Sequence, residues 1–452
     1  MFAAPKPRWV LRILEQFNSP TFRKIAGSIA LKVVSVALGF GLNWYLAQLL
    51  VPKALGSYFL VLSVITFGSV LSRQGFDRIV VRSHAARSEG PESVFIRPFQ
   101  NWVSLRIAAL AVLVGVILFF LAPVLANDLF NKPGITGSLQ IVGFGILAVS
   151  LLQNSTEAFK GVGQIYLGLS MWGLLFPLLN VLLLSAMYYA LQDQIDWGHK
   201  MAIVSYTAAA AAVFLLGRIF WYRATKTSKI DGSEIDQAPK HREEVHGHRK
   251  LWLVSILEFS VNLVPTFILG VYVNVEDIGV FELAKRTSLL VPFFLMAFNS
   301  VVGPRFAALY KQDKMFAIQS LGFKSTILLV ALSAPIVLLI VFFPQEVMSI
   351  FGAAYTRGAE LLIYMVLGQV VNVVCGPVGI LLIMTKRDNE KLYATLSGFA
   401  VMVSLCFILI PIMGVRGGAI AVMSGLITQN LMSIVFVYKV FKFVPLLRPR
   451  KS

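Results

Sequence analysis

Long apolar runs separated by short polar connections make up most of the chain. A helix needs about 20 mostly apolar residues to cross a lipid bilayer. Runs of that length occur at roughly 25–50, 55–77, 102–126, 137–160, 163–190, 201–222, 251–273, 280–303, 320–343, 359–384, 392–412 and 417–438. The pattern therefore predicts an all-α polytopic membrane protein with about twelve transmembrane helices.

The polar stretches between these runs divide the chain into segments. The longest stretch, residues 223–250, is too polar to pack, and we interpret it as a cytoplasmic linker between two bundles at 25–222 and 251–438. Residues 1–24 are basic and partly amphipathic, which indicates an N-terminal segment at the membrane interface. Residues 439–452 form a basic tail.

The two predicted six-helix bundles resemble each other in sequence. LAQLLVPKALGSYFL (46–60) and LGVYVNVEDIGVFEL (269–283) align without a gap, so that Gly56 falls on Gly279. An internal repeat of two six-helix halves is typical of transporters, whose binding site lies between the halves. The repeat therefore predicts two pseudo-symmetric bundles and a transport function.

Composition and charge agree with a membrane location. The chain has 452 residues, of which 57% are hydrophobic and only 14% charged, whereas soluble domains average about 25% charged residues. The net charge of +18 would indicate nucleic-acid binding in a soluble protein, but here Lys and Arg gather in alternate connections. That bias marks the cytoplasmic side of a membrane protein and predicts that both termini are cytoplasmic. The bilayer is therefore the expected partner, and nucleic acid is not.

The sequence offers little catalytic or metal-binding chemistry. It has no G-x-x-x-x-G-K-[ST] motif for nucleotide binding, and its five histidines suggest no catalytic triad. The histidines of segment 241–250 could bind a metal with a nearby glutamate, but a solvated role is favoured in so charged a linker. Cys375 and Cys406 lie inside apolar runs and imply no disulfide framework. We predict no enzyme, no metal site and no cofactor, and leave proton or sodium coupling open.

Three segments carry a resemblance to a known family. They are LAQLLVPKALGSYFLVLSVITFGSVLSRQGFDRIVVR (46–82), FILGVYVNVEDIGVFELAKRTSLLVPFFLMAFNSVVGPRFAALY (267–310) and IFGAAYTRGAELLIYMVLGQVVNVVCGPVGILLIMTKRDN (350–389). Their order and spacing resemble polysaccharide-biosynthesis flippases of the multidrug/oligosaccharidyl-lipid/polysaccharide exporter superfamily. The matching segments touch both halves of the chain.

The resemblance implies two bundles that open alternately to each leaflet of the bacterial inner membrane. It implies transport of undecaprenyl-diphosphate-linked oligosaccharide from the cytoplasmic to the periplasmic leaflet, with a polysaccharide polymerase and a chain-length regulator as candidate partners. Lipid II flippases of the superfamily usually carry two further helices, which the apolar pattern of this chain does not contain. Their absence from the pattern favours the Wzx-type, oligosaccharide-repeat branch.

Two rival interpretations stay open. One is a cation-coupled multidrug exporter of the same superfamily, although organic cations prefer acidic and aromatic cavities. The other is a non-transporting scaffold in a polysaccharide assembly complex, which would explain the basic tail but not charged residues inside the predicted spans.

Those charged residues are the candidate site. A bare diphosphate cannot be buried in hydrocarbon, and Arg or Lys supplies charge-assisted hydrogen bonds to its oxygens. An ionisable residue inside a membrane span is therefore a functional candidate by default. The candidate substrate-binding cations are Lys32, Arg73, Arg218, Lys285 and Arg286. Arg73 and Arg218 are close enough to the predicted interface to extend into it instead.

Nearby acids are candidates for coupling or for a latch. Asp77 follows Arg73 at i+4, and Glu282 precedes Lys285 and Arg286 at i+3 and i+4, so local ion pairs are expected. The group formed by Glu282, Lys285 and Arg286 keeps one positive charge, and we favour Arg286 as the residue that faces the cavity.

Glu258 is the clear acid in the inner half of the second bundle, at a depth comparable to that of Lys32. A Lys32–Glu258 contact would form a latch between the halves, or Glu258 would bind a coupling proton or sodium ion. A buried salt bridge without a mechanistic role is the alternative.

Overall fold

The computed structural model describes residues 20–87, 95–190, 198–225 and 248–443. All regular elements within these ranges are helical. The first half of the chain supplies α2 (Pro20–Leu49), α3 (Pro52–Arg73), α4 (Phe76–Arg87), α5 (Ile96–Val124), α6 (Thr136–Gln140), α7 (Val142–Gly161), α8 (Ile165–Ser170), α9 (Phe176–Ala190) and α10 (Gly198–Ala224). The second half supplies α12 (His248–Tyr272), α13 (Val275–Ser288), α14 (Phe293–Lys311), α15 (Met315–Phe342), α16 (Pro344–Ser349), α17 (Ala359–Cys375), α18 (Val378–Met384), α19 (Asp388–Met413) and α20 (Val415–Phe441).

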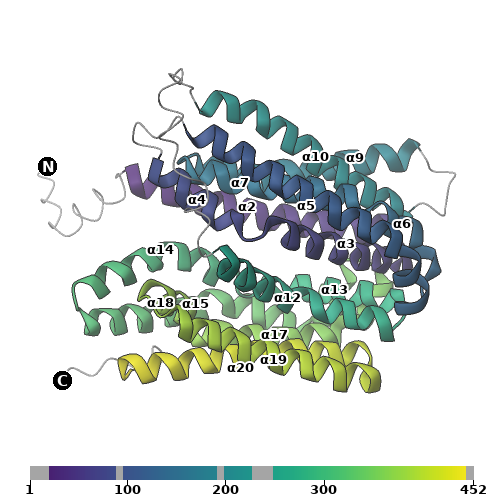
Figure 1. Cartoon of the computed structure of the whole chain (residues 1–452). Helices are drawn as coiled ribbons and strands as arrows, with labels where there is room; N and C mark the ends of the chain where they lie inside the picture. Colours follow the sequence, from purple (N-terminus) through teal and green to yellow (C-terminus); the bar gives the residue numbers. More distant parts are fainter. Residues whose placement is uncertain (1–19, 88–94, 191–197, 226–247, 444–452) are drawn as a thin grey trace, which may run out of the picture.

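The helices form two stacked lobes that run along a common axis (Figure 1). Helices α2–α10 make the N-lobe, and α12–α20 make the C-lobe. Helix α2 begins and α20 ends at the same end of the molecule, at the left of Figure 1, which we call the terminal end. The opposite end, where α2 is followed by α3 and α12 by α13, is the far end.

The predicted all-α polytopic fold is confirmed. In the described part of the chain, nine helices are long and apolar enough to cross a membrane, and a bent pair, Pro133–Gln140 with Val142–Gly161, raises the number to ten. Two predicted runs remain. Helix α12 occupies one of them and contributes a shorter apolar stretch, Phe259–Tyr272, and the other run is divided between α13 and α14. The predicted segments 1–24, 223–250 and 439–452 fall largely outside the described residues, so they stay predictions.

Besides the bent pair α6–α7 within the run 137–160, two further predicted spans are broken rather than continuous. The run at 280–303 is interrupted at 289–292 between α13 and α14, and Pro292 immediately precedes α14. The run at 359–384 breaks at Gly376, whose φ of +71° is left-handed, before Pro377. Proline lacks the backbone N–H that continues a helix, and glycine tolerates left-handed dihedrals. Apolar periodicity detects neither break.

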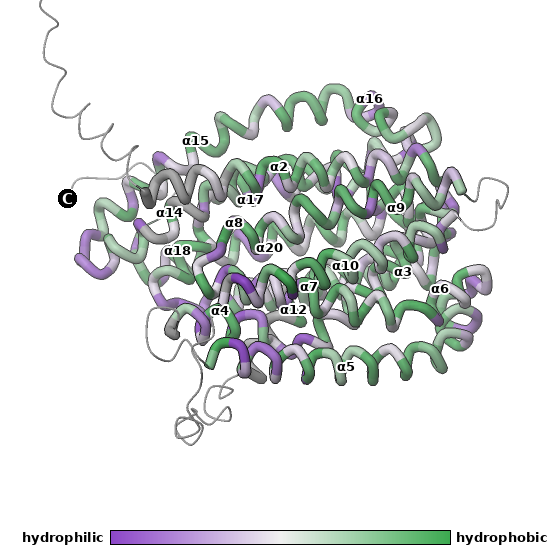
Figure 2. The backbone as a smooth tube through the Cα atoms, turned by 90° about the horizontal axis from the view of Figure 1, so that it is seen from above, coloured by the Kyte–Doolittle hydropathy of each residue, from purple (hydrophilic) through white to green (hydrophobic). Residues whose placement is uncertain are grey.

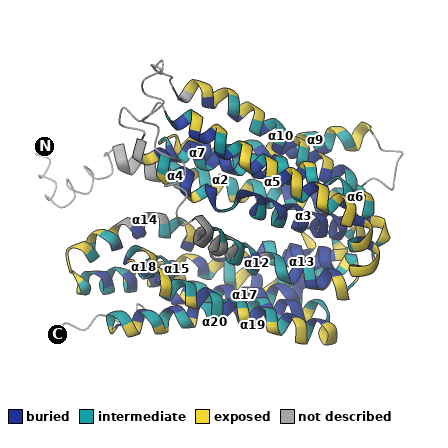
Figure 3. Cartoon of the chain, viewed as in Figure 1, coloured by how far each residue is buried: buried dark blue, intermediate teal, exposed yellow. Residues whose placement is uncertain are grey.

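Burial follows the position of each helix within the lobes. Helices α3 and α13 lie at the centre and are mostly buried, whereas large apolar side chains of α5, α15 and α19 are exposed, as on Phe120, Phe342 and Ile412 (Figure 3). Hydrophobic residues run along the middle of most helices, and hydrophilic ones gather near helix ends (Figure 2). An apolar outer surface of this extent is suited to lipid rather than water.

The lobes close on each other at the far end, where α3 crosses α13. A Cβ atom built on Gly56 would lie 1.7 Å from the backbone oxygen of Val275, and one on Gly279 would lie 3.1 Å from the Gly56 nitrogen. The two glycines that align in the sequence repeat therefore meet at this crossing. Only residues without a Cβ allow backbones to approach so closely.

Polar contacts between the lobes reinforce this closure. Trp44 Nε1 and Gln48 Nε2 donate hydrogen bonds to the Ile350 carbonyl at 3.0 and 3.1 Å, and the Tyr355 hydroxyl donates to the Leu50 carbonyl at 3.3 Å. All of these contacts join the N-lobe to the C-lobe at the far end.

We expect Gly56→Ala to loosen the far end, because the new methyl group overlaps the Val275 carbonyl. With Cys375 and Cys406 replaced by Ala, a Tyr355→Cys reporter should react with a water-soluble maleimide about tenfold faster, which is a shift of roughly 1.4 kcal/mol toward the open form. Gly39→Ala is the matched control, because a Cβ there meets no atom within 4 Å. Equal labelling rates in the two variants would contradict the closing role of the Gly56 crossing.

Candidate functional site

A cavity of about 760 Å³ lies between the lobes, on the terminal side of the far-end closure. The N-lobe contributes residues from α2, α3, α7, α8 and α10 and from the π-helical turn Met171–Leu175. The C-lobe contributes side chains from α12 and α14. The cavity therefore occupies the interface that the sequence repeat predicts for a binding site.

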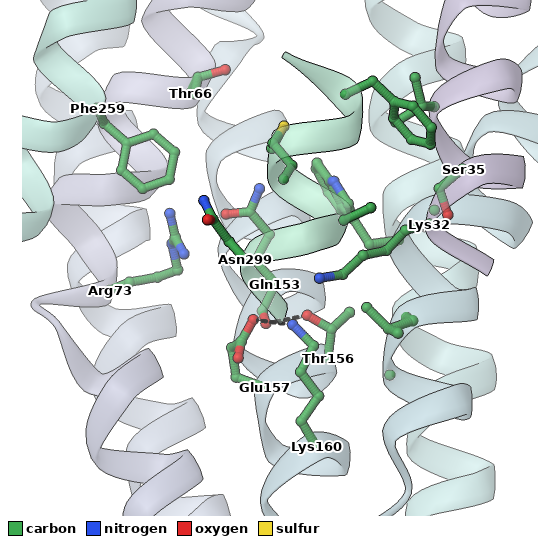
Figure 4. Close-up of a pocket in the computed structure, with 18 of the residues that line it drawn as sticks. Lys32, Ser35, Thr66, Arg73, Gln153, Thr156, Glu157, Lys160, Phe259 and Asn299 are labelled. Atoms are coloured by element: carbon green, nitrogen blue, oxygen red, sulfur yellow. Dashed lines mark hydrogen bonds and ion pairs between the residues drawn. The ribbon is translucent and has the colours of Figure 1, made fainter. Parts of the chain in front are cut away.

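Positive charge exceeds negative charge in this cavity. Among the described lining residues the cations are Lys32, Arg73 and Lys160, and the carboxylate is Glu157. Glu157 pairs with Lys160 at 2.6 Å. Lys32 projects toward this pair from α2, on the other side of the cavity, and lies near enough to Lys160 for electrostatic interaction (Figure 4). Two ammonium groups held this close favour an anion between them.

Arg73 is nearly buried at one side of the cavity. It forms an ion pair with Asp77, as the i+4 spacing predicts, and its Nε donates to the Ser69 carbonyl at 3.3 Å. Its guanidinium also lies 5.5 Å from the ring centroid of Phe259 on α12, in the other lobe (Figure 4). Arg73 is therefore partly neutralised, and its cation–π contact spans the lobe interface.

A second charged cluster lies on α13. Glu282, whose side chain is 5% exposed, pairs with Lys285 and with Arg286, the latter at 3.5 Å, and accepts a hydrogen bond from Thr266. The ion pairs expected from the sequence spacing are thus present. With one carboxylate against two cations, the cluster keeps a positive charge.

Arg286 carries that charge toward the N-lobe. Its guanidinium lies 4.6 Å from the ring centroid of Phe59 on α3, and 34% of its side chain is exposed. It is also within electrostatic range of Tyr206, which lines the cavity. Arg286 therefore lies near the closed side of the cavity without being one of its lining residues.

The structure brings together only part of the predicted cationic site. Lys32 and Arg73 line the cavity, whereas Lys285 and Arg286 belong to the α13 cluster. Arg218 does not reach the cavity: it donates hydrogen bonds to Asn101 Oδ1 at 3.0 Å and to the Tyr222 hydroxyl at 2.9 Å within the N-lobe. The sequence places Arg218 near one end of a predicted span but does not indicate the direction in which α10 orients its side chain.

Two of the three candidate coupling acids have described side chains. Asp77 and Glu282 form the ion pairs described above. The Glu258 side chain lies outside the described residues, so the Lys32–Glu258 latch stays a prediction. No group of three or more His, Cys, Asp or Glu side chains that could hold a metal ion occurs among the residues searched, which are the described ones.

Sequence reasoning missed the α7 face of the cavity. Gln153, Thr156, Glu157 and Lys160 lie within about two turns of α7 and all line the cavity. A signal was available, because Glu157 and Lys160 are ionisable residues at i,i+3 inside the apolar run 137–160. The rule that selected Lys32 would have selected them too.

Comparisons with known proteins assign a family model to each lobe. A family described as polysaccharide biosynthesis protein matches residues 45–162, and the MatE family matches residues 251–408. No curated protein matches the sequence.

Solved structures share the fold at low sequence identity. An inward-facing multidrug resistance MATE family transporter of the MOP superfamily is 14% identical, covers 92% of this chain and 98% of its own, and has a TM-score of 0.73. An outward-facing structure of a multidrug resistance MATE family transporter is also 14% identical, with coverage of 92% and 95% and a TM-score of 0.63. The lipid II flippase MurJ in an inward closed conformation is 13% identical, with coverage of 92% and 90% and a TM-score of 0.65.

We expect Glu282→Gln to destabilise the protein strongly, because it leaves Lys285 and Arg286 as adjacent, uncompensated cations. Removing one partner from a buried ion pair typically lowers the free energy of unfolding by about 3–5 kcal/mol. The measurement is the thermal unfolding midpoint of detergent-purified protein.

The matched control is Glu157→Gln. Its pair with Lys160 is about 30% exposed on both sides, so the loss should stay below about 1 kcal/mol. Adding Lys285→Gln to Glu282→Gln should recover part of the loss. Equal stability of the two single variants would mean that the α13 cluster is solvated rather than buried.

Proposed function

We propose that this chain, a member of the multidrug/oligosaccharidyl-lipid/polysaccharide exporter superfamily, is a flippase for an undecaprenyl-diphosphate-linked oligosaccharide. The cargo moves from the cytoplasmic to the periplasmic leaflet of the bacterial inner membrane. The observation that carries this proposal is the cationic cavity between the lobes, in which Lys32, Arg73 and Lys160 outweigh Glu157 among the described lining residues.

A cationic cavity is suited to the head group of such a lipid. Moving a diphosphate into hydrocarbon requires replacement of its hydration shell, and Lys and Arg provide charge-assisted hydrogen bonds to its oxygens. Lys32 and Lys160 approach from two helices, α2 and α7, and would hold phosphate oxygens between them.

The cavity also has an apolar side, which suits the lipid part of the cargo. Val36 on α2 and Phe293 and Met296 on α14 line it, and Met296 is 61% exposed. Polar and apolar walls in one cavity match a molecule whose head is charged and whose tail stays in the membrane.

Transport would follow from alternation between the two ends. With the far end closed, the cavity lies on the terminal side, which the Lys/Arg bias of the sequence assigns to the cytoplasm. We propose that Arg286 becomes the second contact for the diphosphate when the lobes part at Phe59 and the far end opens. Asp77 and Glu258 are our candidates for binding a proton or sodium ion that drives the cycle.

The second candidate function is a cation-coupled multidrug exporter. It is favoured by the fold shared with multidrug resistance transporters, one of which has a TM-score of 0.73. The surplus of cations in the cavity disfavours it, because an organic cation would be repelled there. A scaffold role beside a polymerase and a chain-length regulator would leave the charged cavity between the lobes unexplained.

We expect the purified protein, reconstituted in liposomes, to exchange a fluorescent undecaprenyl-diphosphate sugar between leaflets. Lys32→Ala and Lys160→Ala should each slow exchange about tenfold, since each removes a charge-assisted contact of roughly 1.5–3 kcal/mol. Arg286→Ala should also slow exchange, because a proposed second contact is lost. The measurement is the loss of fluorescence after dithionite is added outside the liposomes, because dithionite bleaches only the fluorophores that reach the outer leaflet.

Arg218→Ala is the matched control, since it removes a cation of the same lobe that lies outside the cavity. Its exchange rate should stay within about twofold of wild type. Normal exchange in the Lys32 and Lys160 variants would leave the flippase intact but refute the cationic site. A wild type that moves no lipid under a proton or sodium gradient, yet binds organic cations, would favour the drug exporter.

The proposed orientation predicts a labelling pattern in intact cells. Asp313 lies between α14 and α15 at the terminal end, and Glu346 lies on α16 at the far end; both are exposed. With Cys375 and Cys406 replaced by Ala, a membrane-impermeant maleimide should label Glu346→Cys in whole spheroplasts, and Asp313→Cys only after lysis. The reverse pattern would invert the direction of transport.

A further inference from the structure

Trp172 occupies an unusual stretch of backbone beside the cationic cavity. The span 165–190 is not a uniform α-helix, because residues Met171–Leu175 form a π-helical turn between α8 and α9. A π turn inserts one residue into a helix and changes the direction of the side chains around it, and such turns recur at functional sites. Trp172 lies in this turn and lines the cavity.

Gly173, the residue after Trp172, allows α2 to pack closely against the π-helical turn. A Cβ atom built on Gly173 would lie 2.0 Å from Ser35 Oγ, so only glycine allows α2 to approach this closely. Lys32 is one turn before Ser35 on the same helix, and both residues line the cavity. Trp172 and Lys32 therefore lie on adjoining segments of the cavity wall.

The Trp172 ring is held by neighbouring aromatic side chains. It stacks on Phe176 with ring centroids 4.9 Å apart and an interplanar angle of 6°. Phe176 meets Tyr206 edge-on, also at 4.9 Å. Tyr206 is buried and lines the cavity as well. A ring fixed in this way presents a rigid aromatic wall without loss of rotamer freedom on binding.

Two amide oxygens without partners belong to residues that line the same cavity. Gln153 Oε1 on α7 and Asn299 Oδ1 on α14 have no hydrogen-bond partner, although both residues line the cavity (Figure 4). Buried polar atoms in native proteins are normally paired. Two free acceptors at opposite lobes suit a ligand that carries several hydroxyl donors.

We propose that Trp172, Gln153 and Asn299 form a sugar subsite for the residue that is directly attached to the diphosphate. This inference rests on the proposed flippase function. The C–H face of a pyranose carries partial positive charge and packs on the negative face of an aromatic ring. The hydroxyl groups would donate to the two amide oxygens, while Lys32 and Lys160 hold the diphosphate.

The positive charge beside this subsite distinguishes it from a binding site for cationic drugs. An aromatic wall by itself would also attract an organic cation through its π face. Lys32 and Lys160 line the same cavity, and their repulsion acts against any cationic ligand. A neutral sugar beside an anionic group satisfies both the aromatic wall and the ammonium groups.

The test compares two probes, undecaprenyl diphosphate and undecaprenyl-diphosphate N-acetylglucosamine, for binding to full-length protein in nanodiscs. Wild type should bind the sugar-bearing lipid more tightly. Trp172→Leu should weaken binding of the sugar-bearing lipid about fivefold to tenfold and leave the sugar-free lipid within about twofold, in line with the energy of one aromatic contact. Trp172→Phe should restore part of the difference.

Two controls separate this inference from the function on which it rests. Lys32→Ala should weaken the binding of both probes equally. Phe120→Leu, at an exposed position outside the cavity, should change the binding of neither probe. Equal effects of Trp172→Leu on both probes, or no effect, would overturn the sugar subsite while the flippase stands. A wild type that binds neither probe would overturn the proposed function and the subsite with it.

Discussion

The structure depends on one constraint, which is that a charge inside a membrane protein needs either a partner or a polar cavity. Glu282 neutralises part of the charge of Lys285 and Arg286, and Asp77 does the same for Arg73. Each of these pairs lies on a single chain segment, so each lobe can carry its charges into the membrane before the lobes meet. The α13 cluster keeps one positive charge, which Arg286 carries toward the N-lobe. In the cavity itself, the described lining residues include three cations and one carboxylate.

The close crossing of α3 and α13 decides which end of that interface is open. Gly56 and Gly279 bring two backbones into contact, and hydrogen bonds from Trp44, Gln48 and Tyr355 join the lobes around them. A backbone contact of this kind is either made or broken, because packed interfaces have discrete arrangements. The closure and the cavity are therefore two consequences of the same lobe arrangement.

The cavity combines three kinds of surface that a lipid-linked sugar would need. Lys32 and Lys160 provide positive charge, Trp172 provides an aromatic wall, and α14 provides apolar contacts through Phe293 and Met296. These residues come from helices that are distant in the sequence. Neither lobe alone encloses the cavity, so a substrate there would sense the relative position of the lobes.

Local physical rules determined much of this protein from its sequence alone. The bilayer fixes the length of an apolar run, and i+3 or i+4 spacing fixes which charges can pair, so the all-α polytopic fold and the pairs of Arg73 and Glu282 were predictable. Tertiary structure alone decided that Lys32 and Lys160 share a cavity and that Arg218 does not reach it. It also decided the breaks near Pro292 and Gly376 and the π turn around Trp172. The direction in which a helix presents a side chain depends on its neighbours, and an almost uniformly apolar helix has no polar face from which to read that direction.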